Sequence, residues 1–258
     1  MAELISQSVE PALEYFPLLI LGILPSLIWL FYFLEKDNDP EPRMMIVTVF
    51  IFGMIGAMVA GSLQPVLRSL LYRLADCPDL NCPEMTLVGL LDSFLIVAFL
   101  EELSKLVAVL FGVFHLAKKE IDEPVDLIIY MITAGLGFAA LENYLYFNHA
   151  PSSILTEVIF LRFAITTLFH ALAAGLMGYF LALSVRRLRK DVALAGLVTV
   201  SFFHTLYNVL VEMITGDERL IYPSLLLTFL MILTLALMKA FTELKKMKGI
   251  SLPFANKN

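Results

Sequence analysis

Charged residues are scarce in this chain: Asp, Glu, Lys and Arg make up 16% of its 258 residues, whereas soluble domains carry about 25%. The hydrophobic share is correspondingly high, at 59%, and the mean hydropathy is +0.83. So much apolar sequence cannot be buried in one soluble core of this size. The composition therefore excludes an ordinary soluble domain and predicts an integral membrane protein.

Basic residues near the N-terminus and cysteines are also scarce, which narrows the class of protein further. The first 15 residues contain no Lys or Arg, so they lack the basic start of a cleaved signal peptide, and we expect the first apolar stretch to be retained. No stretch is basic enough to indicate a nucleic-acid partner. The only cysteines, Cys77 and Cys82, have no further Cys or His nearby to complete a zinc pattern. Their spacing allows a small disulfide loop in an oxidising compartment, and equally two free thiols.

Long apolar stretches fill most of the chain. We predict about seven membrane-spanning helices, because a span needs about 20 apolar residues and such stretches can cross lipid only as helices. The predicted spans are 16–34, 44–67, 87–115, 125–147, 154–184, 192–214 and 221–241. The predicted fold is therefore all-α: a single transmembrane helical domain over 1–258, with a motif-bearing core at about 86–214. Gly53, Ala57 and Gly61 recur every four positions in the second span, which indicates close helix packing.

Lys and Arg are distributed unequally between the two sides of the predicted bundle. Thirteen of them lie in the odd-numbered connections and the tail, against three in the even-numbered connections. Because connections rich in Lys and Arg stay in the cytoplasm, the N-terminus is predicted outside and the tail, 242–258, in the cytoplasm. The chain is thus expected to be a multi-pass protein of the cell membrane.

Several ionisable residues lie inside the predicted spans, where each costs about 2.5–3.5 kcal/mol on insertion scales. They lie on four successive spans: Glu101 and Glu102 on the third, Glu142 on the fourth, His170 on the fifth, and His204 with Asn208 on the sixth. A rise of about 1.5 Å per residue places the carboxylates and imidazoles between the outer third and the middle of the hydrocarbon core. Four helices that carry ionisable groups at one depth favour a shared site.

Taken one at a time, these polar residues have ordinary structural interpretations. Glu101 precedes Lys105 by four positions, which suits an ion pair on one helical face. Arg162 suits a structural counter-ion, and Asn143 and Asn208 suit hydrogen bonds between helices. The whole set at one depth is harder to explain structurally, so we predict a functional site.

Carboxylates and histidines in a membrane-buried pocket allow three kinds of chemistry. A metal held by three Glu or His ligands keeps one position open for water, with a further Glu as general base. Glu and His can also activate water without a metal, and His204 and Asn208 would then donate hydrogen bonds to the developing oxyanion. The same groups can relay protons in a proton- or cation-coupled transporter, although such proteins usually show repeats and none is visible. A receptor or a scaffold would not need so many buried carboxylates.

Four motifs, in order on successive spans, resemble the PrsW family of intramembrane proteases. They are E-E-x-x-K at 101–105, F-x-x-x-E-N at 138–143, H-x-x-x-x-x-x-x-G at 170–178 and H-x-x-x-N at 204–208. The pattern is more distantly similar to the CAAX-prenyl endopeptidase superfamily. That superfamily has a His where Glu142 stands and an Arg near the position of Lys105, so the departures favour PrsW and argue against a prenylated substrate.

The resemblance implies that Glu101 and Glu102 activate water and that Glu142, His170 and His204 complete the site, as metal ligands where a metal such as zinc is bound. It further implies cleavage of a single-pass membrane protein, such as an anti-sigma factor, on its outer side. We therefore predict an intramembrane endopeptidase, embedded in the bilayer, that hydrolyses a membrane-protein substrate by Glu/His-activated water with or without a metal.

Overall fold

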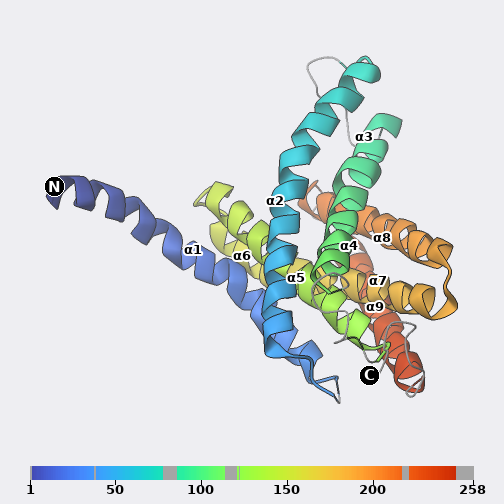
Figure 1. Ribbon diagram of the computed structural model, residues 1–258. Helices are drawn as coiled ribbons and strands as arrows, with labels where there is room; N and C mark the ends of the chain where they lie inside the picture. The colour runs from blue at the N-terminus through green and yellow to red at the C-terminus, as the bar shows by residue number, and fades with distance from the viewer. Residues whose placement is uncertain are drawn as a thin grey trace.

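The computed structural model describes residues 2–37, 39–77, 86–113, 121, 123–216 and 221–247. Across these ranges the regular structure is helical and contains no strand (Figure 1). The elements are α1 (Ala2–Leu34), α2 (Arg43–Leu74), α3 (Leu87–Leu91), η2 (Asp92–Phe99), α4 (Leu100–Gly112), α5 (Asp126–His149), α6 (Leu155–Leu161), η4 (Arg162–Thr166), α7 (Thr167–Arg187), α8 (Lys190–Gly216) and α9 (Ile221–Lys245). The predicted all-α fold class is confirmed.

Six helical stretches are long and apolar enough to cross a membrane. They are Phe16–Leu34, Arg43–Leu74, Asp126–His149, Leu155–Arg187, Lys190–Ile214 and Ile221–Lys245, and they match six of the predicted spans. The other predicted span, 87–115, is helical through α3, η2 and α4, but Glu101, Glu102 and Lys105 make its middle too polar to be assigned by composition. The chain is therefore a multi-pass membrane protein, while the seventh span and the orientation stay predictions. Cys82, its pairing with Cys77, and residues 248–258 of the predicted tail lie outside the described residues.

Helix α5 lies at the centre of the bundle. In its most apolar stretch 83% of the residues are buried inside the protein, against 28% in α1 and 22% in α9. Its most extensive contacts are with α1, α2 and α7, and Figure 1 shows α2 crossing over it. A helix that is apolar on all sides belongs inside a bundle, so α5 positions the elements around it.

Close contact between α2 and α5 depends on glycine. A Cβ on Gly53 would lie 2.1 Å from the carbonyl oxygen of Ala134, and one on Gly137 would lie 2.0 Å from the carbonyl oxygen of Phe50. Any side chain at either position would therefore strike main chain, so the two backbones touch directly. The prediction of close packing is confirmed at Gly53 but is wrong at Gly61, where a Cβ would meet nothing within 4 Å.

Two π-helical segments, η2 and η4, each lead directly into a helix that carries site residues. A π turn holds one more residue than an α turn, so it rotates the helical face that follows it, and such segments are frequent at functional sites. Glu101 lies in the first turn of α4, just after η2, and His170 lies in the first turn of α7, just after η4. Both segments thus influence where the site residues point.

Candidate active site

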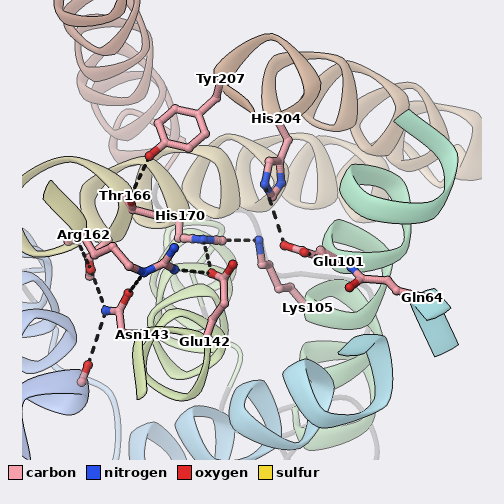
Figure 2. A network of polar contacts seen from close by, with 12 residues as sticks. Gln64, Glu101, Lys105, Glu142, Asn143, Arg162, Thr166, His170, His204 and Tyr207 are labelled. Atoms are coloured by element: carbon pink, nitrogen blue, oxygen red, sulfur yellow. Dashed lines mark hydrogen bonds and ion pairs between the residues drawn. The ribbon is translucent and has the colours of Figure 1, made fainter. Parts of the chain in front are cut away.

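The ionisable residues predicted from the sequence converge where α4, α5, α7 and α8 meet (Figure 2). Glu101 and Glu102 come from α4, Glu142 from α5, His170 from α7 and His204 from α8. The side chain of Glu142 is 20% exposed, and those of the other four are at most 8% exposed. Four helices therefore bring five ionisable groups into one largely buried cluster.

Lys105 lies in the middle of this cluster and is fully buried. Its Nζ donates to Glu102 Oε1 at 2.6 Å and lies 2.9 Å from His170 Nδ1. Because an ammonium can only donate hydrogen bonds, His170 Nδ1 accepts and the ring proton is on Nε2. The predicted ion pair of Lys105 with Glu101 is wrong: the structure pairs Lys105 with Glu102, three positions earlier, which is also a neighbouring position on the helical face.

Glu102 is also bound to His204. The distance from His204 Nδ1 to Glu102 Oε1 is 2.8 Å, so a proton on Nδ1 is donated to the carboxylate and the Nε2 lone pair stays available. A histidine whose second nitrogen is held by a carboxylate in this way is the usual arrangement of a metal-binding imidazole. Glu102 thus orients Lys105 and His204 rather than facing open space.

Arg162 neutralises Glu142, which confirms its predicted role as a counter-ion. Arg162 Nη2 lies 2.9 Å from Glu142 Oε2, and His170 Nε2 lies 2.8 Å from the same oxygen. The guanidinium is itself fixed, because its Nε donates to Asn143 Oδ1 at 2.7 Å and the Asn143 amide donates to Thr167 Oγ1 at 3.0 Å. This network ties α5 to η4 and α7 and confirms that Asn143 links helices.

Glu101 differs from the other two carboxylates in its charged partners. Its Oε1 accepts from Gln64 Nε2 at 3.0 Å, and its Oε2 lies 3.8 Å from His204 Nε2; like Oε2 of Glu102, it is buried and has no hydrogen bond to any described residue. Glu102 is paired with Lys105 and Glu142 with Arg162, but no Lys or Arg in the described ranges forms an ion pair with Glu101. A buried carboxylate without a compensating charge is costly, so Glu101 is the group most suited to take up a proton or a cation.

A cavity of about 340 Å³ borders the cluster. Glu101, Glu142, His204 and Asn208 line it, together with residues of α2, η2 and α5. Glu102, Lys105 and His170 lie behind these groups. The site therefore has a reactive face toward the cavity and a supporting layer behind it.

The donor set has the composition of a metal site. Ligand atoms of Glu101, Glu142 and His170 lie within 4.8 Å of one another, and carboxylate with imidazole is a usual ligand set for zinc. By hydrogen bonding, however, His204 is better prepared than His170, because both nitrogens of His170 are occupied by Lys105 and Glu142. Of the predicted ligands, Glu142 and His170 belong to this group, together with Glu101, while His204 does not.

Two contributors were absent from the predicted site. Lys105 belongs to the E-E-x-x-K motif, but its spacing predicted only an ion pair with Glu101. Gln64 lies in the otherwise apolar second span and holds Glu101. An isolated amide in an apolar stretch is a weak signal of a site, and the packing of α2 against α4 brings it to the carboxylate.

Replacing Lys105 by Met should destabilise the protein by about 3–5 kcal/mol, the cost of leaving one member of a buried ion pair alone. Thermal unfolding in detergent micelles measures this loss. The double variant Glu102→Gln/Lys105→Met removes both charges and should recover part of it. Equal stabilities of the wild type and Lys105→Met would show that the pair contributes nothing to folding.

Residues 41–238 match the model of the PrsW family intramembrane metalloprotease. Among curated proteins, the chain is 28% identical over 215 residues to Protease PrsW of Oceanobacillus iheyensis, covering 82% of this chain and 91% of the relative. It is 31% identical over 201 residues to Protease PrsW of Bacillus subtilis, covering 75% and 82%, and 29% identical over 197 residues to Protease PrsW of Geobacillus kaustophilus, covering 75% and 79%. No solved structure gives a significant match. The family resemblance predicted from the four motifs is confirmed, and the transporter alternative finds no support.

Proposed function

The chain belongs to the PrsW family of intramembrane metalloproteases, and from this premise we propose that Glu101 activates the water that cleaves a peptide bond of a membrane-protein substrate. The observation that carries the proposal is the position of Glu101: its side chain lines the cavity, and its buried Oε2 has no hydrogen bond to a described residue. Oε2 of Glu102 also lacks a hydrogen bond, but Glu102 does not line the cavity and is paired with Lys105. Glu102 is the less suitable base, because Lys105 and His204 both hold it away from the cavity.

The proposed reaction uses the groups along the cavity in sequence. Glu101 Oε2 accepts a proton from water as the water oxygen forms a bond to the carbonyl carbon of the substrate. The amide of Asn208, one turn after His204 and also lining the cavity, donates to the developing oxyanion. The carbon–nitrogen bond then breaks, and Glu101 returns the proton to the leaving amine.

For the metal we propose zinc, held by Glu142, His170 and His204. When bound, it would polarise the scissile carbonyl and make the attacking water more acidic. The supporting layer favours this assignment, because Glu102 fixes His204 through Nδ1 and Arg162 fixes Glu142 through Oε2. The remaining carboxylate, Glu101, is then left as the base.

The zinc content of purified variants distinguishes the proposed metal ligands from the proposed base. We expect Glu142→Gln and His204→Ala to lower the zinc content of the purified protein at least about tenfold, the usual order of loss for a disturbed metal site, while Glu101→Gln keeps it. Elemental analysis after removal of loosely bound metal gives the measurement. Loss of zinc in Glu101→Gln would instead make Glu101 a ligand, and unchanged content in the other two variants would exclude both from the metal site.

The proposed substrate is a single-pass membrane protein, such as an anti-sigma factor, cut near the outer end of its span. The cavity is lined by Arg68, Tyr146 and Asn208, late residues of α2, α5 and α8, and these helix ends lead to the connections that we predict outside. Comparing new protein N-termini in membranes that contain wild type or Glu101→Gln tests the proposal. Cleavage products specific to the wild type and mapping near outer span ends are expected; identical N-termini in both membranes would contradict it.

A further inference from the structure

Helix α2 touches the main chain of α5 at one level and faces open space at Gly61, further along. At Gly53 a Cβ would collide with the main chain of Ala134, yet at Gly61, about two turns further along α2, it would meet nothing within 4 Å. Gly61 lines the cavity, and Gln64 in the next turn holds Glu101. The space beside Gly61 is therefore continuous with the space that Glu101 faces.

Packing does not explain a glycine at this position. Glycine in the middle of a helix lowers helix stability, and at Gly53 this is offset by close contact with α5. At Gly61 no neighbour lies close enough to need the missing side chain. Glycine is also the residue that lets another main chain approach a helix closely, and Gly61 is exposed along the cavity that Glu101 faces.

We propose that the substrate enters between α2 and α5 and that its main chain, unwound and extended, crosses α2 at Gly61 on its way to Glu101. This inference rests on the proposed protease function. The cavity volume of about 340 Å³ is at the small end of ligand pockets, which suits a short extended segment and not an intact helix. A protease also needs a peptide bond whose carbonyl has been released from helical hydrogen bonding.

The chemistry of the lining favours a polypeptide over a lipid chain. Gln64, Glu101 and Asn208 contribute polar groups to the cavity, and an acyl chain could satisfy none of them. An extended main chain offers both N–H and C=O groups to such side chains. Phe138 and Leu145, on the α5 side of the cavity, suit the apolar side chains of a membrane segment.

The test uses purified protein reconstituted into vesicles of phosphatidylethanolamine and phosphatidylglycerol with a pool of single-span peptides. Each peptide carries an apolar stretch of about 20 residues, followed by a varied outer segment. Gly61→Ala, Gly61→Val and Gly61→Leu should show a graded loss of cleavage, reaching about 100-fold in kcat/KM for Leu, the effect of displacing a reacting group by about 1 Å. Their unfolding temperatures should not fall below that of the wild type.

Ser62→Leu is the matched control, because the next residue on α2 is exposed and does not line the cavity; it should cleave at the wild-type rate. A second readout needs no activity: peptides carrying photoreactive leucine in the outer segment, bound to Glu101→Gln, should cross-link to α2 around Gly61. Wild type that cleaves the pool while Gly61→Leu cleaves it equally well, or cross-links confined to other helices, would overturn this inference alone. If the wild type cleaves no peptide and Glu101→Gln forms no cross-link, that result would count against the proposed function itself.

Discussion

Glu101→Gln is expected to lower kcat/KM by about 10²–10⁴-fold, the usual contribution of a general base, without lowering the unfolding temperature. The amide keeps the size of the side chain and can still accept from Gln64 through its carbonyl oxygen. It cannot take a proton from water. Glu101 has no ion-pair partner among Lys and Arg in the described part of the chain, so removing its charge leaves no cation without a partner.

Glu102→Gln is the comparison that gives this prediction its meaning. It should also reduce cleavage, but with a lower unfolding temperature, because Lys105 loses its buried counter-ion and His204 loses the carboxylate that orients it. The two variants thus distinguish the residue that acts as the base from the residue that holds Lys105 and His204 in place. Full activity in Glu101→Gln, with activity lost only in Glu102→Gln, would assign the base to Glu102 and reverse the two roles.

Much of the fold follows from the apolar lengths of the sequence. The third span illustrates the limit, because Glu101, Glu102 and Lys105 make it too polar to identify by composition, and only its length and neighbours suggest that it crosses the membrane. The π segments could not be predicted either, since an extra residue in a turn leaves no mark on hydropathy. The partner of Lys105 could not be predicted from spacing either, because residues three and four positions away share its helical face and the structure selects Glu102.

The convergence of Glu101, Glu142, His170 and His204 could be predicted, because buried charges in lipid are costly and need partners. Which of the two neighbouring carboxylates faces the cavity could not be predicted. Glu101 and Glu102 are adjacent in sequence and chemically identical, and successive helical residues point about 100° apart. Which one faces the cavity depends on how α4 is rotated against α5 and α8. Gln64 and Gly61 were outside the prediction for a related reason: they reach the site because α2 packs against α4 and crosses α5.

That crossing supports the second large prediction. Gly137→Ala should destabilise the protein by about 3 kcal/mol, the upper end of the overpacking range, because the new Cβ would lie 2.0 Å from the main-chain oxygen of Phe50. A main-chain atom cannot swing aside as a flexible side chain can, so the helices must move apart. Thermal unfolding in detergent micelles measures the loss.

Gly61→Ala provides the control on the other helix of the same pair. Its Cβ would meet nothing within 4 Å, so its unfolding temperature should stay the same or rise, since Ala is the better helix former by about 1 kcal/mol.

The contact between α2 and α5 also affects catalysis, because Glu142 follows Gly137 on α5 and Gln64 follows Gly53 on α2. Moving the helices apart would draw Gln64 and Glu101 away from Glu142, so Gly137→Ala should lose cleavage together with stability. If Gly137→Ala proved as stable and active as the wild type, the close α2–α5 contact would not be what holds the site together.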